Sequence, residues 1–174
     1  KKNVLVVGAG IKTGLNIRID NPAQLGSDLV VDSVAAIVEY PAPLLIFDLG
    51  TANTVCVIDK NKNYIGGMIY PGIGVSLDSL TAHASQLGGI SIEAPEHMIG
   101  KNTTECMKSG LIYSSADAMD GIIDRLQEQL GGEATVIATG GLAKKIVPHC
   151  RREIILDDDL LLKGLAIIYK KNRK

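Results

Sequence analysis

Apolar residues near the start of the chain follow two different patterns. Val4–Gly8 is a short and almost wholly apolar run, which predicts a buried strand. From Asn21 onward the apolar residues recur at helical spacing as far as about Glu39. Asn21 is a favoured N-cap residue and Pro22 suits the first helical position, so one helix is predicted from Pro22 to Glu39.

The middle of the chain contains three short apolar segments, Leu44–Phe47, Val55–Asp59 and Tyr64–Tyr70. Between the second and the third lie Asp, Lys and Asn residues that favour tight turns, so these two strands are predicted to form a hairpin. Together the three strands predict an antiparallel meander. A doubly wound parallel sheet does not contain such a run, and the expected fold class is therefore α/β with a mixed sheet.

The second half of the chain has mainly helical spacing, with one further strand predicted at Val136–Ala138. Adjacent glycines separate several segments and stop the helices. The predicted helices span 76–87, 102–114, 115–130, a short stretch after Gly141 to about Val147, and a last segment that Asp157 caps.

The overall composition limits the classes of partner. The chain has 174 residues, of which 46% are hydrophobic and 21% charged, as in a globular protein of one domain or two small lobes. Its net charge of -1 gives no electrostatic basis for binding nucleic acid or an anionic membrane, and no apolar run has the length of a membrane span. The cysteines are widely spaced and odd in number, which indicates neither a disulfide framework nor a zinc site, so a cytoplasmic location is expected.

A turn rich in small polar residues follows the first strand of the predicted meander. It begins with Asp48, a carboxylate at the end of a buried strand, and Gly50 lets the backbone approach a ligand closely. Thr51, Asn53 and Thr54 add hydroxyl and amide groups, and hard cations and phosphates favour such groups. The turn therefore predicts a phosphate- and metal-facing site. The alternative from the turn alone is an ordinary hairpin.

A second candidate site lies where the strand Val136–Ala138 runs into Gly140 and Gly141. Adjacent glycines before a helix let a flat ring lie against the backbone, close to helix N-terminal N–H groups. A tight loop without a ligand is the alternative. An early metal-facing turn combined with a late Thr-Gly-Gly-Leu turn is the layout of actin-like kinases.

Asp28 is a candidate general base for a hydroxyl group. If the helix starts at Pro22, Asp28 lies near its second turn, shares a face with Gln24 and Leu25, and lies beside Gly26. Most Asp residues near the start of a helix are simply solvated, so this position alone decides little.

Two other motifs are weaker. Gly8–Gly14 has glycines spaced partly as in a dinucleotide-binding loop, but Thr13 occupies the third glycine position and no helix is predicted to start there. Lys12 and Thr13 resemble part of a Walker loop, but no glycine precedes the lysine. The three histidines lack metal-ligand spacing.

Taken in order, these segments resemble the type III pantothenate kinases. The resemblance covers nearly the whole chain, and several matches in series are more specific than one short motif. The matching segments are Gly10–Asn16, Asp20–Pro22 with Gly26–Asp28, Asp48–Thr54, Gly66–Ile73, Ile99–Thr103, Ala138–Ala143 and Asp159–Leu165.

The resemblance implies an actin/acetate-sugar-kinase fold with ribonuclease-H-like lobes. It implies transfer of the γ-phosphoryl group of ATP to the primary hydroxyl of pantothenate, the first step of coenzyme A biosynthesis. ATP, Mg²⁺ and a monovalent cation, K⁺ or NH₄⁺, would take part. Residues 1–43 would be the end of the first lobe with the pantothenate-site helix. Residues 44–174 would be the second lobe, with the cation- and ATP-binding turns and the helices of a homodimer.

The resemblance also implies roles for single residues. Asp28 would orient and deprotonate the hydroxyl, and Asp48 would hold the monovalent cation. The pantothenate-binding residues would be Gly26, Ser27, Leu29 and Thr103, the last often across the dimer interface. The ATP-binding residues would be Gly50, Thr51, Thr54, Gly140 and Gly141.

The chain departs from the family pattern at several positions. Leu29 replaces an Arg that would pair with polar groups of the substrate, Cys56 replaces an Asp, and Asp32 replaces an Asn. Family members also begin with a strand ending in Asp-x-Gly-Asn-Thr, which cradles phosphates. The chain lacks this segment, so it is expected to be inactive alone.

Two other functions stay open from the sequence. The first is a catalytically impaired relative that serves as a scaffold or accessory regulator, which Leu29 and Cys56 favour. The second is a nucleotide-binding oxidoreductase built on Gly8–Gly14, against which the predicted antiparallel meander speaks.

Overall fold

The computed structural model describes residues 4–8, 10–84 and 86–173. The elements in chain order are β1 (Asn16–Ile17), a 3-10 turn (Pro22–Gln24), α1 (Ser27–Glu39), β2 (Leu44–Leu49), β3 (Ala52–Ile58), β4 (Asn63–Pro71), α2 (Ile73–His83), α3 (Thr103–Leu130), β5 (Thr135–Thr139), α4 (Ala143–Ile146), a 3-10 turn (Val147–His149), β6 (Ile155–Leu156) and α5 (Leu160–Asn172).

The strands form one mixed sheet in the order β1-β4-β3-β2-β5-β6. The pairs β2–β3 and β3–β4 are antiparallel, and the other pairs are parallel. The predicted meander is therefore confirmed. Its second turn forms because Asp59 Oδ1 accepts hydrogen bonds from the backbone N–H groups of Asn61 and Asn63, each at 2.8 Å. The expected α/β class, a mixed sheet with a three-strand meander flanked by helices, is also confirmed.

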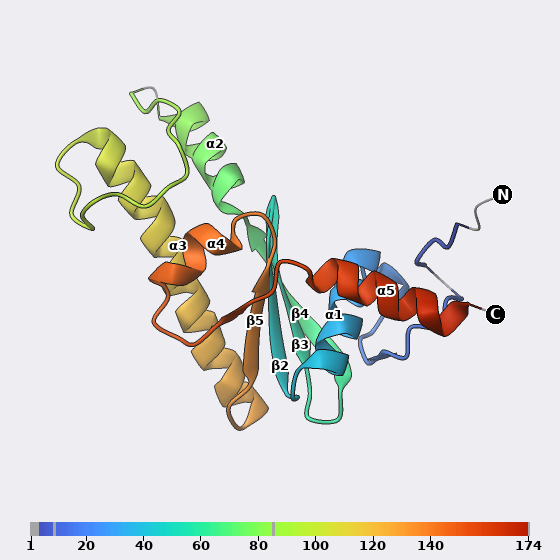
Figure 1. The fold of residues 1–174 in the computed structure, drawn as a ribbon. Coiled ribbons are helices and arrows are strands. Elements are labelled where there is room, and N and C mark those ends of the chain that lie inside the picture. The colour runs from blue at the N-terminus through green and yellow to red at the C-terminus, as the bar shows by residue number, and fades with distance from the viewer. Residues whose placement is uncertain (1–3, 9, 85, 174) are drawn as a thin grey trace.

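Helices cover both faces of the sheet (Figure 1). On one face α3 and α4 pack over a cluster that includes Phe47 and Val55. On the other face α1 packs over a cluster that includes Ile46, Cys56 and Ile137. Alternate residues of a strand point to opposite faces of the sheet. The faces of Phe47, Val55, Ile46, Cys56 and Ile137 therefore show which face each of the remaining side chains of β2, β3 and β5 points to.

Helices α1 and α5 pack closely against each other. A Cβ atom added at Gly164 of α5 would collide with the carbonyl oxygen of Val31 and would lie 2.7 Å from its Cγ1. Gly164 therefore allows the two helix backbones to approach. Asp157 joins the same region, since it accepts hydrogen bonds from the hydroxyl group of Tyr40 and from Lys163 Nζ, both at 2.7 Å.

An arm made of α2 and the N-terminal half of α3 extends beyond the sheet (Figure 1). A small cluster that includes Ile73, Leu77 and Ile112 holds the two helices together. No helix in the described part of the chain is long and apolar enough to cross a membrane.

The predictions for the first segments need two corrections. Val4–Gly8 forms no strand, and Val4 and Val6 are 83% and 75% exposed. Leu5 and Val7 pack against the α1–α5 region, but a strand also needs a neighbouring strand, and none among the described residues pairs with this segment. The predicted cap at Asn21 starts only the 3-10 turn, and α1 itself begins at Ser27.

The second half needs further corrections. The two helices predicted over 102–130 are one helix, because the hydroxyl groups of Ser114 and Ser115 donate to the carbonyl of Leu111 and do not interrupt it. Strand β6 was not predicted, since its two residues are exposed and show no strand pattern. The last helix begins after Asp159, and Asp157 lies just before its first turn.

Candidate active site

Three polar side chains lie in one row across the sheet. Asp48 near the end of β2 is opposite Thr54 on β3 and Thr139 at the end of β5. Ile46, two residues before Asp48, faces α1, so the whole row faces α1 as well. The carboxyl ends of the parallel strands β2 and β5 thus place a carboxylate and a hydroxyl group beneath the start of α1.

Helix α1 adds two more carboxylates above this row. Asp28 lies in its first turn, not in the second turn as predicted, and Asp32 lies one turn further along. Residues four apart share one face of a helix, and both carboxylates line the same pocket. This pocket, called the acidic pocket here, has a volume of about 420 Å³ and is lined by Asp28, Asp32, Asp48, Thr139, Gly140, Gly141, Asp158 and Leu161.

Gly140 brings the two predicted turns together. Its φ angle of +92° favours glycine, and an added Cβ would collide with Asp48 Oδ1 and lie 2.6 Å from the backbone nitrogen of Leu49. The backbone N–H of Leu142 also donates to the carbonyl of Leu49 at 3.2 Å. A side chain at position 140 would therefore push the two turns apart. By contrast, a Cβ at Gly141 would meet nothing within 4 Å.

Two carboxyl groups in the acidic pocket, those of Asp32 and Asp48, have raised pKa values. Asp32 is only 2% exposed, and burial, followed by the charges of Asp48, Asp28 and Asp157, raises its pKa to about 7. Burial and the charge of Asp28 also raise the pKa of Asp48. The pocket lining contains no Lys or Arg. A phosphate group would therefore meet net negative charge here unless a cation accompanied it.

Two buried oxygen atoms beside the acidic pocket have no hydrogen-bond partner, Oδ1 of Asp32 and Oγ1 of Thr54. Leaving such atoms unpaired is costly, and oxygen ligands of this kind suit hard cations. Within the described ranges no three His, Cys, Asp or Glu side chains are arranged to hold a metal by themselves. The donor set fits a cation that takes its remaining ligands from water or from a bound phosphate.

A second pocket lies on the other side of the first turn of α1, where Leu29, the residue after Asp28, lines it. It has a volume of about 510 Å³ and is called the apolar pocket here. Its lining residues are Ile19, Asp20, Asn21, Gln24, Leu25, Gly26, Leu29, Val55, Tyr64, Gly66, Gly67, Met68 and Ile69. The first turn of α1 therefore has Asp28 on the acidic pocket and Leu29 on the apolar pocket. This arrangement can bind a charged group and an uncharged group on two sides of one carboxylate.

Comparison with known proteins places this chain in a family. A sequence profile described as type III pantothenate kinase matches residues 1–125. The chain belongs to the type III pantothenate kinase family. A family member from an Exiguobacterium species is 46% identical over 170 residues, covering 98% of this chain and 66% of its own length. Another from Bacillus cytotoxicus is 46% identical over 168 residues, covering 97% of this chain and 64% of its own length.

The chain thus spans 64 to 66% of the length of these two relatives. Among solved structures, a protein described as a conserved putative Baf family transcriptional activator from Campylobacter jejuni superposes with a TM-score of 0.58 at 22% identity. That match covers 90% of this chain and 68% of the other, and it shows a shared fold.

This pantothenate kinase family member brings most of the predicted site residues together. Asp28, Asp48, Gly140 and Gly141 line the acidic pocket, and Gly26 and Leu29 line the apolar pocket. Thr103, the first residue of α3, lines neither of them. Ser27, the first residue of α1, is between Gly26 and Asp28 but is not among the lining residues either.

The turn between β2 and β3 lies beside the acidic pocket. Gly50 and Thr51 form its tip, and the carbonyl of Thr51 accepts a hydrogen bond of 3.0 Å from the backbone N–H of Gly72. A Cβ at Gly72 would collide with the carbonyl oxygen of Gly50. The Pro71-Gly72 segment at the end of β4 therefore holds this turn in place, with Thr54 at the base.

Four residues that line the acidic pocket were not predicted as site residues, namely Asp32, Thr139, Asp158 and Leu161, and of these Asp32 is the most deeply placed carboxylate. The spacing of four between Asp28 and Asp32 on a helix was the signal that could have identified Asp32. Nothing in the sequence alone marks this carboxylate as buried.

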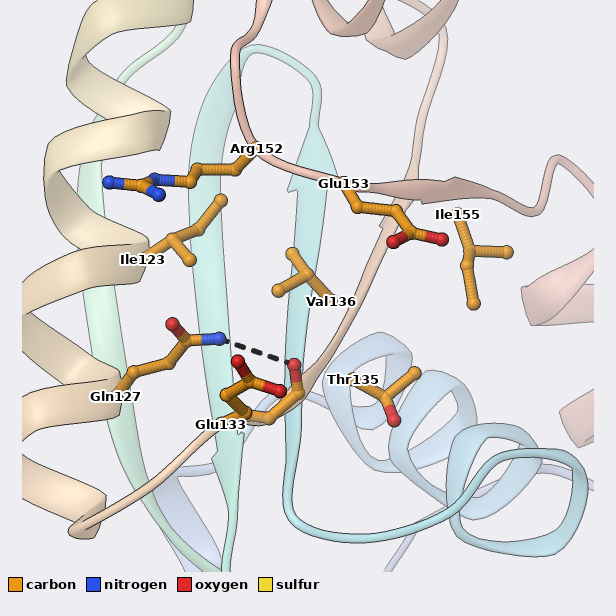
Figure 2. A pocket seen from close by; sticks show the side chains of 9 residues that line it. Ile123, Gln127, Glu133, Thr135, Val136, Arg152, Glu153 and Ile155 are labelled. Atoms are coloured by element: carbon orange, nitrogen blue, oxygen red, sulfur yellow. Dashed lines mark hydrogen bonds between the residues drawn. The ribbon is translucent and has the colours of Figure 1, made fainter.

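A further pocket, of about 350 Å³, lies at the other end of β5, where Ala134, Thr135 and Val136 line it. Figure 2 shows Gln127 at its wall, donating a hydrogen bond of 3.3 Å to the carbonyl of Ala134. The guanidinium group of Arg152 there is paired with Asp124 at 2.8 Å. The pocket is therefore remote from the carboxyl ends of β2 and β5 and lacks the acidic residues of the site.

The glycine-rich loop near the start does not form a nucleotide site. No helix follows Gly14, and the next element is the short strand β1. The carbonyl of Thr13 accepts a hydrogen bond of 2.8 Å from Lys171 Nζ, and Lys12 bonds to Asn172 at the end of α5. The loop is thus hydrogen-bonded to the end of α5. This agrees with the sequence, in which neither the dinucleotide-binding pattern nor the Walker pattern is complete.

Proposed function

We propose that the protein transfers the γ-phosphoryl group of ATP to the primary hydroxyl of pantothenate, giving 4'-phosphopantothenate for coenzyme A synthesis. One observation carries the proposal: Asp28 stands between a polar pocket suited to phosphates with cations and an apolar pocket suited to an acceptor. Membership of the type III pantothenate kinase family supports this reaction. Phosphoryl transfer depends mainly on positioning and on neutralising charge, and this layout serves both.

Asp28 would accept the proton of the acceptor hydroxyl. Gly26, Ser27 and Leu29 surround it in the chain and would contact pantothenate on the side of the apolar pocket. The phosphates of ATP would lie along the acidic pocket, against the residues Gly50, Thr51, Thr54, Gly140 and Gly141. The absence of a Cβ at Gly140 supports this placement, because it lets the two turns pack against each other at the acidic pocket.

Cations are needed because the acidic pocket is itself negative. Asp48 would hold a monovalent cation, K⁺ or NH₄⁺, and the buried oxygen atoms of Asp32 and Thr54 lie on the same face. Mg²⁺ would accompany the triphosphate. The chemistry that these ions supply is charge neutralisation of the phosphoryl group during transfer.

The test is a turnover assay on the protein in its natural full length, with ATP, Mg²⁺, K⁺ and pantothenate. Replacing Asp28 by Asn should lower kcat by about 10²- to 10⁴-fold, the usual contribution of a general base. Asp78 on the exposed side of α2 offers a matched control, and Asp78→Asn should keep the wild-type kcat. A full-length protein that turns over equally well with Asn at position 28 would contradict the assigned base.

A second candidate is a catalytically impaired relative with an accessory role. Leu29 favours it, since this position lines the apolar pocket and supplies no charge for the substrate. The same assay separates the two candidates. Binding of pantothenate without turnover in the full-length protein, reversed by Leu29→Arg, would support the impaired relative.

We also propose that the protein is a homodimer, with residues 1–43 completing a first lobe and residues 44–174 forming a second. Thr103 lies at the start of α3 in the arm and lines neither pocket of its own chain, which supports a role toward a partner chain. Light scattering on the full-length protein measures the mass directly. A monomer at micromolar concentration would contradict the dimer.

A further inference from the structure

Asp32 is a buried carboxylate that the proposed reaction leaves without a role of its own. It is 2% exposed, it lines the acidic pocket, and its Oδ1 has no hydrogen-bond partner among the described residues. A carboxylate in such a place is costly unless a positive charge or hydrogen-bond donors accompany it. An oxygen atom that the chain itself has buried is within reach of a small ion but not of another protein segment. Asp32 therefore points to a small cationic ligand.

Thr54 presents a second unsatisfied oxygen atom to the same region. Its Oγ1 is buried and has no hydrogen-bond partner in the described ranges. Thr54 lies directly opposite Asp48 in the β2–β3 ladder, and this row faces α1. Asp48 is also the charged group that acts most strongly on Asp32. A carboxylate oxygen from α1 and a hydroxyl oxygen from the sheet therefore lie together beside Asp48.

The surrounding charge favours a divalent cation over a second monovalent one. Asp28, Asp32 and Asp48 all line the acidic pocket, and a monovalent ion at Asp48 balances at most one of these carboxylates. Mg²⁺ and Mn²⁺ take oxygen ligands, and Mg²⁺ is commonly held by one or two carboxylates with water in the remaining positions. This agrees with the finding that no three His, Cys, Asp or Glu side chains of the described residues surround a metal by themselves.

We propose that Asp32 and Thr54 hold a divalent cation, Mg²⁺ or Mn²⁺, in the absence of any nucleotide. Asp32 supplies a carboxylate ligand through Oδ1, Thr54 supplies a hydroxyl ligand, and water completes the coordination. This site is additional to the monovalent cation proposed at Asp48 and to the Mg²⁺ that accompanies the triphosphate. The inference goes beyond the proposed reaction, since cation binding without nucleotide does not depend on phosphoryl transfer.

The test is electron paramagnetic resonance of Mn²⁺ with the full-length protein, without nucleotide and with K⁺ in excess, because free and bound Mn²⁺ give different signals. Wild type is expected to bind Mn²⁺, and Mg²⁺ should displace it. Asp32→Asn should weaken this binding by about tenfold or more, and Thr54→Val by a smaller factor. Absence of Mn²⁺ binding, or equal affinities of wild type and Asp32→Asn, would overturn the inference. Either result would leave the proposed reaction standing, since that reaction is judged by turnover.

Asp158→Asn is the matched control for the charge of the pocket. Asp158 lines the same pocket, but its side chain is 44% exposed and pairs with Lys144 at 2.5 Å. The variant removes a negative charge and no oxygen atom of the proposed site, so it should leave the affinity for Mn²⁺ within about threefold of wild type. An equal loss for Asp32→Asn and Asp158→Asn would mean that the pocket attracts cations by its overall charge alone, and the inference would fail.

Unfolding by urea gives an independent measurement on the same proteins. A cation that binds only the folded state stabilises it, so Mn²⁺ should raise the free energy of unfolding of wild type. Asp32→Asn should gain much less from the same concentration of Mn²⁺. An equal gain in wild type and variant would contradict the site.

Discussion

Replacing Asp32 by Asn is expected to stabilise the protein by an amount that depends on pH. Asp32 is 2% exposed, and burial with the nearby charges of Asp48, Asp28 and Asp157 raises its pKa from 3.8 to about 7. Because the pKa of Asp32 is higher in the folded state than in the unfolded state, the contribution of this residue to stability is fully present below pH 3.8. It is lost as the pH rises through 7. From these two values, Asp32 destabilises the folded state, relative to a side chain that does not ionise, by about 2 kcal/mol at pH 5 and about 4 kcal/mol at pH 8.

Asn is nearly isosteric with Asp and does not ionise, so the variant escapes this cost. The variant Asp32→Asn should therefore have a higher free energy of unfolding than wild type, measured with urea in the absence of divalent cations, and this gain should be about 2–3 kcal/mol larger at pH 8 than at pH 5. Asp78→Asn, an exposed helical position, should show no such change. If the difference between Asp32→Asn and wild type were the same at both pH values, the reasoning about this buried carboxylate would be refuted.

Three further substitutions test the packing around the site. Gly140→Ala should lower the free energy of unfolding by about 1–3 kcal/mol, because the residue has a positive φ and no room for a Cβ, whereas Gly141→Ala should change it by less than about 0.5 kcal/mol in the same urea titration. Gly164→Ala should destabilise by about 1–3 kcal/mol by forcing α1 and α5 apart, while Gly110→Ala in α3, where a Cβ would meet nothing within 4 Å, should be neutral or stabilising by up to about 1 kcal/mol. Burial opposes ionisation of Asp157, but hydrogen bonds from a lysine and a tyrosine outweigh it and lower its pKa, so its stabilising effect should be present near neutral pH and lost on acidification. The difference between wild type and Asp157→Asn should accordingly shrink below about pH 4, and a difference that persisted at pH 2 would contradict this.

The sequence was informative where local chemistry decides the structure. The turn at Asp59 was predictable, because Asp and Asn bind their own backbone, and this turn fixed the hairpin and hence the meander. The apolar runs of β2 and β5 marked buried strands for the same reason. Since Asp48 and Gly140 each follow such a strand, their meeting at one edge of the sheet was also within reach.

The sequence was less informative where the structure of a segment depends on contact with a segment far away in the chain. Val4–Gly8 has the apolar run of a strand, but a strand forms only beside another strand, and sequence spacing does not show whether one is present. The break predicted at Ser114–Ser115 is bridged because hydroxyl groups can bond to the helix carbonyls one turn earlier. The two exposed residues of β6 form a strand only because β5 lies beside them.

The candidate site shows the same division. The types of residue at Asp28, Asp48 and Gly140 indicated their chemistry from the sequence. The sequence did not predict how these residues are arranged. Helix α1 begins at Ser27 and not at Pro22, which places Asp28 in its first turn, and Asp32 lies buried at the acidic pocket. Burial of Asp32 depends on how α1, α5 and the sheet pack. The presence of a charged residue in a helix does not predict that it is buried.

Detection of the product by ³¹P NMR tests the central claim most directly. The full-length protein, incubated with ATP, Mg²⁺, K⁺ and pantothenate, is expected to produce the phosphomonoester signal of 4'-phosphopantothenate together with ADP. The Asp28→Asn variant should give that signal at a rate lower by about 10²-fold or more. Phosphate released from ATP without any phosphomonoester, or a product that forms as fast with Asn at position 28, would contradict the account.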